Sequence, residues 1–445
     1  MTATMTTRPA TVNTGATYGD IQSDMKSAMN NIFFDTPDKT IFEYDELFGA
    51  HHYKRLATVV RKTEGAYIYT ADGRKILDCL SAYSSANAGH HHPKIVQAAI
   101  DALTQKRASV ISNVVYTSSL ALFLEKLATF VPQLGPRFGA KGNKVLPKNG
   151  GVESVETAIK LARFYGWKKK GIADGSQEII VFSENFHGRT TTVISFSPNP
   201  KYKEGFGPLA TGFKTATYGD VKSVEALITA NTCALLVEPM QGEGGMNIPP
   251  AGFLKGLRAL CDQHDLLLIF DEIQSGMGRT GKDFAFQHDN VTPDAIILGK
   301  YLGGGLAPLS CLVTNRELMD LVFTPGKDGS TFGGNPFAAA CGIAALDVLR
   351  EERLSERSAA VGAKLNRALV DSVGSLASVK QVRGRGLFIG VEVNDGDAMR
   401  YCHKLLDLDM LANDSHGHTI RISPPLIIGD AEIDFICDRL KKVLA

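Results

Sequence analysis

The chain has 445 residues, of which 44% are hydrophobic and 21% charged, and its formal net charge is +1. A chain of this length exceeds one ordinary hydrophobic core, so we expect two or three globular domains. The small net charge provides no electrostatic field for nucleic acid or an anionic membrane, and no apolar run approaches the roughly 18 residues of a membrane span.

The N-terminal segment shows little hydrophobic periodicity. Its first forty residues are rich in Thr, Ala and Asn, and they lack the apolar stretch of a secretion signal. Asp20, Asp24 and Asp35 also distinguish it from transit peptides, which are poor in acidic residues. We therefore expect residues 1–39 to form a partly disordered arm, in a cytoplasmic protein.

Seven cysteines are scattered along the chain, and none forms a C-x-x-C pair. An odd number at irregular spacing is typical of reduced core thiols, not of a disulfide framework or a zinc site. His90-His91-His92 resembles a metal cluster, but consecutive side chains diverge, whereas ligands on one helix face need i, i+4 spacing. Gly89 and Pro93 indicate a turn instead, and we expect no metal.

The middle of the chain has the pattern of an α/β domain. Residues 40–94 carry two strand-like runs around the turn Thr70-Ala-Asp-Gly-Arg-Lys75, and we expect this segment to join a small domain. From residue 95 to 350, helical patterns alternate with short apolar runs. The clearest runs are residues 178–183, 234–238, 266–270, 295–298 and 310–314. The alternation predicts a mostly parallel sheet with helices on both faces.

The pattern changes after residue 350. A helical stretch at residues 353–372 precedes strand-like runs at 379–382, 387–393 and 419–423. Residues 351–445 are therefore expected to form a smaller α+β domain. Cofactor residues would lie on the large domain, and the substrate would lie between the two.

Glycine-rich and polar segments follow the predicted strands in a regular order. Asn149-Gly-Gly-Val-Glu153 precedes a helix, whose N-terminus offers free backbone N–H groups to a phosphate. Phe186-His-Gly-Arg-Thr190 supplies an aromatic ring for a flat cofactor and an arginine for a carboxylate. Ser330 and Thr331 can bind phosphate oxygens. Each segment alone is equally explained as a cap or a turn, but their common order favours a binding site.

The most informative pair is Asp271 and Lys300. Each follows a short apolar run typical of a buried strand, so both side chains are expected at the carboxyl edge of the sheet, where ligand sites lie. Alone, each is equally a capping aspartate or a surface lysine. Together they suit pyridoxal phosphate, because a lysine can form a Schiff base with it and an aspartate can pair with its pyridinium nitrogen. Glu238 and Glu243 place two more carboxylates after a neighbouring strand.

A nucleotide-binding alternative comes from Gly276-Met-Gly-Arg-Thr-Gly281, a literal G-x-G-x-x-G. With Lys282 it nearly completes a P-loop, but Asp283 stands where Ser or Thr would bind magnesium. A dinucleotide site would also need an amphipathic helix here, and the chain soon reaches Pro293. The glycines are better explained as shaping the loop after Asp271.

The order of these motifs resembles that of class III aminotransferases of fold type I, and within them the ornithine δ-aminotransferases. The resemblance runs from about residue 40 to the C-terminus and rests on Leu80-Ser-Ala-Tyr83-Ser-Ser, Gly89–Pro93, Phe206-Gly-Pro, Asp271-Glu-Ile-Gln274, Leu298-Gly-Lys300, Gly329-Ser-Thr331, and Arg421 before Pro424-Pro425. It implies the α/β fold of pyridoxal-phosphate-dependent transferases, with a large domain (95–350) of seven-stranded type and a smaller α+β domain. It also implies a homodimer or higher homo-oligomer with a shared active site.

The resemblance implies pyridoxal 5'-phosphate as the cofactor and assigns roles to the matching residues. The cofactor-binding residues would be Gly151, Val152, Phe186, Asp271, Gln274, Lys300, Ser330 and Thr331. Lys300 and Asp271 would be catalytic: Lys300 would hold the cofactor and Asp271 would keep its ring nitrogen protonated. Gln274 would contact the ring oxygen, Phe186 would stack on the ring, and the amides of Gly151 and Val152 would hold the phosphate. Thr331 would reach a phosphate in the neighbouring subunit.

The substrate-binding residues implied by the resemblance are Tyr53, Tyr83, Arg189, Glu243 and Arg421. Arg189 would bind the carboxylate far from the cofactor, and Arg421 the carboxylate near it. Glu243 would mask Arg421 when ornithine is bound, although a purely structural ion pair explains this couple equally well. Tyr53 and Tyr83 would line the ornithine end of the pocket.

The expected reaction transfers the δ-amine of L-ornithine to 2-oxoglutarate by a ping-pong mechanism, giving glutamate 5-semialdehyde, which cyclises to pyrroline-5-carboxylate, and glutamate. The expected partners are therefore amino acid and 2-oxo acid substrates, with no nucleic acid and no membrane. Lys54-Arg55 and His187 depart from the pattern of the ornithine enzymes and bear on specificity. The alternatives are another amine donor (acetylornithine, lysine, 4-aminobutyrate or a diamine), a mutase of the glutamate-1-semialdehyde type, and a catalytically silent binding protein with the same fold.

Overall fold

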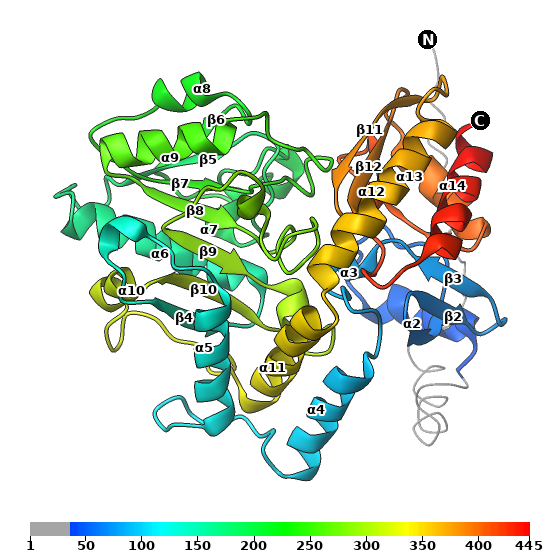
Figure 1. Ribbon diagram of the computed structural model, residues 1–445, viewed down its shortest axis with the longest axis horizontal. Helices are drawn as coiled ribbons and strands as arrows, with labels where there is room; N and C mark the ends of the chain where they lie inside the picture. Colours follow the sequence, from blue (N-terminus) through cyan, green and yellow to red (C-terminus); the bar gives the residue numbers. More distant parts are fainter. Residues whose placement is uncertain (1–35) are drawn as a thin grey trace. The chain divides into compact units, whose positions relative to one another are not determined.

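The computed structural model describes residues 36–445 (Figure 1). The expected N-terminal arm, residues 1–39, lies almost entirely outside the described residues. The described chain forms two compact units, one made of residues 36–63 and 68–76 and the other of residues 64–67 and 77–445. The division into domains at residues 94 and 350 stays a prediction.

The smaller unit contains one helix and the start of a small sheet. Helix α2 (Asp38–Phe48) precedes strands β1 (Val60–Glu64), β2 (Tyr67–Thr70) and β3 (Lys75–Asp78), which are neighbours in that order. The turn between β2 and β3 is closed by a hydrogen bond from the Thr70 N–H to the Arg74 carbonyl at 3.2 Å. Two strands around this turn were predicted, and the structure confirms them.

The larger unit contains a sheet of seven strands in the order β4-β10-β9-β8-β7-β5-β6. These strands are β4 (Asn143–Lys148), β5 (Glu178–Phe182), β6 (Phe213–Ala216), β7 (Thr232–Val237), β8 (Leu267–Asp271), β9 (Ala295–Leu298) and β10 (Ser310–Asn315). Strand β10 is antiparallel to both of its neighbours, whereas the pairs among β9, β8, β7, β5 and β6 are parallel. The predicted mostly parallel sheet is confirmed.

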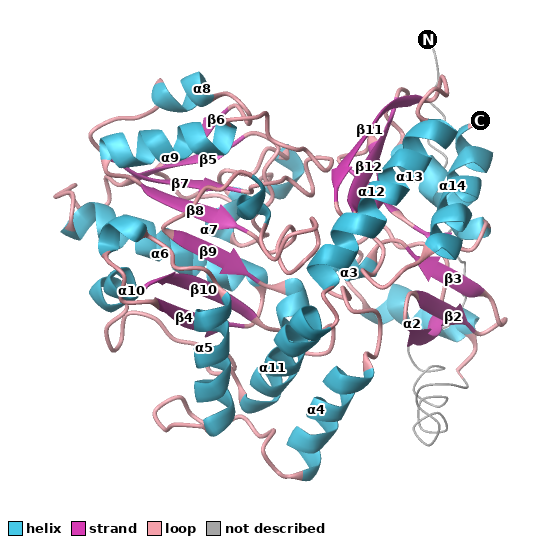
Figure 2. Cartoon of the chain, viewed as in Figure 1, coloured by secondary structure: helices cyan, strands magenta, loops and turns pink. Residues whose placement is uncertain are grey.

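Helices cover both faces of this sheet (Figure 2). The helices concerned are α5 (Ser118–Phe130), α6 (Gly151–Lys168), α9 (Phe253–His264), α10 (Arg316–Val322) and α11 (Pro336–Glu351). Side chains alternate along β8: Leu267 and Ile269 join the core under α6 and α10, while Leu268 and Phe270 join the core under α5, α9 and α11. Burial on both faces explains why these strands are continuous apolar runs in the sequence.

The C-terminal part is an antiparallel sheet covered by helices, and this confirms the predicted α+β character. The sheet has the order β11-β12-β15-β14. Its strands and helices are α12 (Leu354–Val373), β11 (Val379–Arg385), β12 (Phe388–Val393), α13 (Ala398–Asp407), β14 (Asn413–Ser415), β15 (Thr419–Ile422) and α14 (Asp430–Leu444). The remaining elements are α3 (Ser81–Ser84), α4 (Pro93–Thr104), α7 (Thr191–Ile194), α8 (Val221–Glu225), β13 (Met410–Leu411) and 3₁₀ helices at Pro136–Phe138, Pro200–Tyr202, Ala285–His288 and Lys300–Gly303.

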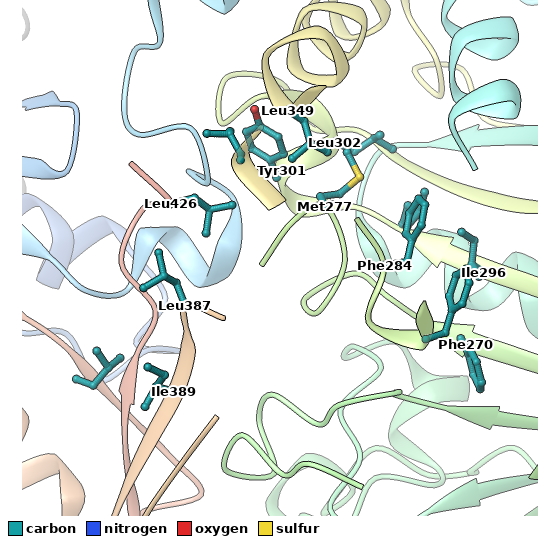
Figure 3. Packing of buried hydrophobic residues seen from close by; sticks show 14 of the residues in the cluster. Phe270, Met277, Phe284, Ile296, Tyr301, Leu302, Leu349, Leu387, Ile389 and Leu426 are labelled. Atoms are coloured by element: carbon teal, nitrogen blue, oxygen red, sulfur yellow. The ribbon is translucent and has the colours of Figure 1, made fainter. Parts of the chain in front are cut away.

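One hydrophobic core joins the large sheet to the C-terminal part. Phe270 and Ile296 of the sheet belong to the same buried cluster as Leu387, Ile389 and Leu426 (Figure 3). A shared close-packed core holds polar side chains on either part at fixed separations, which is what a site assembled from both requires.

The cysteines and the glycine-rich loop are structural. All seven thiols are unpaired, and all except Cys437 are buried, as expected of core thiols. After β8, the segment Gly276–Gly281 is followed by a 3₁₀ turn and not by an α-helix. A Cβ on Gly278 would lie 2.9 Å from Leu349 Cδ1, so these glycines allow a closely packed loop, as predicted. Among the described residues, no helix is both long and apolar enough to cross a lipid bilayer.

Candidate active site

A cavity of about 200 Å³ lies at the carboxyl ends of β5, β7, β8 and β9 and beside the N-terminus of α6. It is lined by Gly151, Val152, Phe186, His187, Gly188, Glu238, Met240, Asp271, Ile273, Gln274, Ser275 and Lys300. Every residue predicted to bind the cofactor is on this wall, except Ser330 and Thr331. Residues up to 149 positions apart in the sequence, Gly151 and Lys300, thus converge where a parallel sheet places its ligand sites.

Asp271 ends β8 and is buried against His187. Its Oδ2 lies 2.7 Å from His187 Nδ1, and its Oδ1 accepts a hydrogen bond from the Ile273 N–H at 3.0 Å. Burial disfavours the imidazolium, but the hydrogen bond and the charge of Asp271 outweigh it and raise the pKa of His187. Within the described chain, His187 Nε2 is buried without a hydrogen-bond partner. An orphaned polar atom in this wall is typical of a site made for a polar ligand.

Lys300 follows β9 and opens a 3₁₀ helix. Its φ of +50° is rare for a residue with a side chain, and such strain is found mainly at functional sites. Exclusion of water lowers the pKa of its ammonium group, against the opposing charges of Glu243 and Asp271. A lysine that releases its proton more readily is a better nucleophile.

The N-terminus of α6 presents backbone N–H groups to the cavity. Glu153 Oε2 already accepts the N–H groups of Asn149 at 3.0 Å and Gly150 at 2.6 Å. The N–H groups of Gly151 and Val152, in the first turn, have no intrahelical acceptor, so they are the donors left for an anion.

Glu238 connects two loops of the cavity. It is buried after β7, and its carboxylate accepts the Phe186 N–H at 3.1 Å and the Gly242 N–H at 3.4 Å. Burial raises its pKa to about 7. The sequence showed Glu238 only as a carboxylate after a strand, and the bond to a loop 52 residues away had no sequence signal.

Arg421 on β15 pairs with Glu243, as the resemblance implied. Arg421 Nη2 lies 2.7 Å from Glu243 Oε1, and the guanidinium is fully buried. The Gln274 side chain contacts both residues. Its Nε2 donates to Glu243 Oε1 at 3.4 Å, and its Oε1 accepts from Arg421 Nη1 at 3.5 Å. Burial opposes ionisation of Glu243, but the charge of Arg421 and the hydrogen bond to it lower its pKa.

The aromatic ring of Tyr83 lies against the guanidinium of Arg421. The Arg421 Cζ atom lies 4.9 Å from the centroid of the Tyr83 ring, and Asn413 Nδ2 donates a hydrogen bond to the Tyr83 hydroxyl at 3.1 Å. Asn413 was not among the residues found from the sequence, because nothing local marks its contact with a residue 330 positions away.

The other predicted residues lie outside the cavity lining. Arg189 is exposed, with its guanidinium 3.6 Å from the centroid of the Tyr202 ring and 5.7 Å from that of Phe186. Ser330 Oγ accepts a hydrogen bond from Asn149 Nδ2 at 3.1 Å, and Thr331 is exposed. Tyr53 belongs to the smaller unit, where its side chain is 65% exposed.

These groups fit a planar, phosphate-bearing cofactor with a basic ring nitrogen. The cavity combines an anion site at a helix N-terminus, an aromatic wall at Phe186, a carboxylate at Asp271 and a reactive amine at Lys300. Pyridoxal phosphate has each feature that these groups would bind.

Comparison with known proteins gives one consistent family. The model of the family described as "Aminotransferase class-III" matches residues 48–444. The chain is 45% identical to an ornithine aminotransferase of Bacillus cereus over 92% of this chain and 99% of that protein. An "Ornithine aminotransferase 2" of Staphylococcus aureus is also 45% identical, over 92% of this chain and 99% of that protein.

Comparison with solved structures also finds aminotransferases. The ornithine aminotransferase of Toxoplasma gondii, described with partial occupancy of pyridoxal phosphate at its active site, superposes with a TM-score of 0.87 at 34% identity, over 95% of this chain and 97% of that one. An acetylornithine aminotransferase of Elizabethkingia anophelis superposes with a TM-score of 0.81 at 39% identity, over 92% of this chain and 98% of that one.

Proposed function

The chain belongs to the class III aminotransferases, which are pyridoxal-phosphate enzymes, and from this premise we propose that it is an L-ornithine:2-oxoglutarate δ-aminotransferase. It would convert ornithine to glutamate 5-semialdehyde, which cyclises to pyrroline-5-carboxylate, and 2-oxoglutarate to glutamate. When bound, pyridoxal phosphate supplies a protonated ring that takes up the charge developing at the carbon beside the transferred nitrogen.

The observation that carries the choice of ornithine is the Arg421–Glu243 pair. Ornithine reacting at its δ-amine has its carboxylate far from the reacting carbon, whereas glutamate has one carboxylate beside it. A free arginine near the reacting carbon would favour α-amines. Glu243 at 2.7 Å would neutralise the charge of Arg421 while ornithine reacts, and release of Glu243 would make Arg421 available to the second substrate.

In this proposal, the residues of the cavity have distinct roles in binding and in proton transfer. Asp271 would pair with the ring nitrogen, and its hydrogen bond to His187 fixes the direction of its carboxylate. Lys300 would hold the cofactor covalently, and its free amine would remove the proton from the substrate carbon. Phe186 would cover one face of the ring, and the Gly151 and Val152 amides would bind the phosphate, since all three residues line the cavity.

Gln274 would contact the ring oxygen, Arg189 would bind the distant carboxylate of ornithine, and Tyr53 would line the ornithine end of the pocket. Support for Arg189 comes from its guanidinium, which lies 5.7 Å from the ring of Phe186 and so beside the cavity wall. Tyr53 rests on the resemblance alone. Arg55, which departs from the pattern of the ornithine enzymes, is paired with Asp45.

We also propose that the active unit is a homodimer. Val114 and Tyr116 are 87% and 103% exposed, and the other exposed apolar residues of this segment and of the Ser330 loop are Val110, Ile111, Val115 and Phe332. Such a patch on a globular protein favours burial against a partner. Asn113 Nδ2 donates to the Ser330 carbonyl at 2.9 Å, so the loop with Ser330 and Thr331 accompanies this surface. That supports their proposed role at the phosphate of the neighbouring subunit. The unpaired thiols support a reducing, cytoplasmic compartment.

A second candidate function is transfer from N-acetylornithine. Its support is the acetylornithine aminotransferase of Elizabethkingia anophelis, which shares 39% identity with this chain, against 34% for the Toxoplasma ornithine enzyme. Both substrates react at the same terminal-amine position, so the cavity described above suits either.

Half-reaction spectra decide between them. The holoenzyme is mixed with ornithine, N-acetylornithine, lysine, 4-aminobutyrate or a diamine, and conversion of the bound cofactor to its pyridoxamine form is followed by absorbance. We expect ornithine to give the largest rate constant per concentration, and 2-oxoglutarate to reverse the change. If ornithine is inert and another amine reacts, the proposed substrate is wrong. Borohydride reduction followed by peptide mapping should place the cofactor on Lys300, and Lys300→Ala is the control.

A further inference from the structure

Tyr83 stands on an unusual turn of backbone. The four residues Ser81, Ala82, Tyr83 and Ser84 all have positive φ angles, of +48°, +45°, +57° and +74°. None is glycine, and consecutive left-handed residues with side chains are disfavoured. Such a segment persists only where the surrounding structure imposes it, and it is usually functional.

The main chain of this turn is fixed at its start. Asp78 Oδ1 accepts the N–H groups of Leu80 and Ser81, both at 2.9 Å. The other oxygen of Asp78 lies 2.8 Å from His90 Nε2, which gives a structural role to the first residue of the triple-histidine motif.

The same turn is tied to the strand that carries Arg421. The Ser81 hydroxyl donates to the Ser423 carbonyl, and the Ser423 N–H donates to the Cys79 carbonyl at 2.7 Å. Ser423 lies two residues after Arg421, so these bonds fix the separation between the left-handed turn and Arg421.

The ring of Tyr83 is held from the neighbouring strand. Asn413 on β14 lies directly opposite Arg421 on β15 in the antiparallel pair. It donates to the Tyr83 hydroxyl at 3.1 Å, while Arg421 Cζ lies 4.9 Å from the ring centroid. Two adjacent strands thus hold the hydroxyl and the face of one tyrosine.

We infer that Asn413 is a positioning residue that fixes the Tyr83 ring over Arg421 and thereby keeps the enzyme selective for the terminal amine of its donor. The inference rests on the proposed function. Glu243 pairs with the guanidinium of Arg421, and Tyr83 covers its face. Loss of the Asn413 hydrogen bond removes one restraint on the ring and allows it to turn, which uncovers Arg421 for a carboxylate beside the reacting amine. Substrates would then bind more often with the α-amine at the cofactor.

Ornithine itself reports this selectivity through its two products. Transfer of the δ-amine leaves an aldehyde that condenses with the α-amine, losing water to give pyrroline-5-carboxylate. Transfer of the α-amine leaves a 2-oxo acid that condenses with the δ-amine, losing water to give pyrroline-2-carboxylate. The ratio of these isomers does not depend on how much of the enzyme is folded.

The test compares Asn413→Ala with Asn394→Ala. Asn394 is the matched control, because it lies in the same C-terminal part and its amide donates to a main-chain acceptor, the Ala377 carbonyl, at 2.8 Å. We expect Asn413→Ala to raise the share of pyrroline-2-carboxylate by about fivefold, the effect of one lost neutral hydrogen bond, and the control to leave it unchanged. Tyr83→Phe removes the acceptor from the other side and should give the same shift, and the double variant should add little to either.

The inference is overturned if Asn413→Ala and Tyr83→Phe both leave the isomer ratio within about twofold of the wild-type ratio, or if Asn394→Ala shifts it equally. A second measurement is hydrogen exchange of the peptide spanning residues 79–86 in the holoenzyme, which should be faster in Asn413→Ala than in the control. If wild-type enzyme forms neither pyrroline from ornithine, the proposed function fails, and the exchange measurement alone then decides the inference: equal exchange in both variants refutes it.

Discussion

Arg421 is a fully buried cation, and its carboxylate partner is Glu243 at 2.7 Å. Removing one partner of a buried pair leaves the other charge without compensation, which typically costs about 3 kcal/mol or more. Because the same pair is proposed to mask Arg421, stability and specificity depend on one contact.

Replacement of Glu243 should therefore change both properties. In Glu243→Gln we expect a free energy of unfolding lower by about 2–3 kcal/mol, since Glu243 is partly exposed. We also expect the ratio of ornithine to glutamate half-reaction rates to fall about tenfold, as an unmasked arginine favours α-amines. Denaturant unfolding and half-reaction spectra measure the two effects. Glu392→Gln, which breaks a pair with Arg383, is the control and should leave the rate ratio unchanged. An unaltered ratio in Glu243→Gln would leave the pair a purely structural role.

The raised pKa of His187 makes the free energy of unfolding depend on pH. Its pKa is raised above the ordinary value of 6.5 in the folded state, because the bond to Asp271 and its charge outweigh the effect of burial. A raised pKa gives a stabilising contribution that is complete below pH 6.5 and is lost as pH rises through the higher folded value.

Asn is the matched replacement for His187, because its amide can donate from near the position of Nδ1 but does not titrate. At pH 6, the free energy of unfolding of the wild-type apoprotein should exceed that of the His187→Asn apoprotein by about 1 kcal/mol, which a higher thermal unfolding temperature would report. The difference should be smaller at pH 9. Glu238 is present in both proteins, so its own titration largely cancels in the comparison. A difference that stays constant between the two pH values would contradict a charged His187.

The sequence was sufficient to predict the site residues that stand in a recognisable local pattern. Asp271 and Lys300 follow apolar runs, and their types suit one cofactor, so their meeting in one cavity follows from the topology of a parallel sheet. Glu238 and Asn413 could not be assigned in this way. Glu238 bonds to a residue 52 positions away and Asn413 to one 330 positions away. Those contacts depend on how distant parts of the chain pack, which no local sequence pattern indicates.

At the scale of elements, the loop carrying Phe186 and His187 lies against the first turn of α6. Gly188 has a φ of +126°, and a Cβ there would lie 2.3 Å from Val152 Cγ2. Glycine is thus required twice, for its backbone conformation and for the close approach to the helix.

Gly188→Ala should displace Val152 and disturb the helix N-terminus. We expect the affinity for pyridoxal phosphate to fall at least about tenfold and stability to drop by about 2 kcal/mol, measured by titrating apoenzyme with the cofactor and by unfolding. Gly175→Ala is the control: Gly175 also has a positive φ, of +80°, but a Cβ there would meet nothing within 4 Å. It should lose some stability without losing cofactor affinity, and equal losses of affinity in both variants would exclude a specific role for the contact between Gly188 and Val152.

The elements differ in how well the sequence predicted them. Strands such as β8 were predicted because burial on both faces makes them uniformly apolar. Strands β4 and β6 were missed, since β4 contains Lys144, Pro147 and Lys148, and β6 contains Lys214 and Thr215 and is only partly buried. The left-handed turn Ser81–Ser84 was also not expected, because its conformation is imposed by Asp78 and Ser423 and not by a glycine.

At the scale of the whole molecule, the loop after β8 links the large sheet to the C-terminal part. Arg279 is fully buried there, and its guanidinium donates to the carbonyls of Leu387 and Pro424 and to Asn87 Oδ1. The glycines of the G-x-G-x-x-G segment around it allow this close packing. A pattern that suggests nucleotide binding in the sequence is therefore explained by the need to join parts of the chain far apart in sequence.

Assembly is the remaining property at this scale. The apolar surface around Val114 and Tyr116 is proposed to be buried in the homodimer, next to the loop with Thr331. In a two-fold interface each substitution occurs twice, so a charge at Val114 leaves two uncompensated charges in the contact. A cost of about 5 kcal/mol in total weakens association by more than a thousandfold.

Val114→Glu should therefore convert dimers to monomers at concentrations near 1 µM, as measured by light scattering after gel filtration. The monomer should also bind pyridoxal phosphate more weakly, because Ser330 and Thr331 would no longer reach the phosphate of a partner. Val370→Glu places the same charge on an exposed valine (48%) of α12 and should remain dimeric. Thr331→Val, which keeps the dimer but removes the hydroxyl, should reproduce the loss of cofactor affinity alone. A wild-type protein that is monomeric yet fully active would show that the site is complete within one chain.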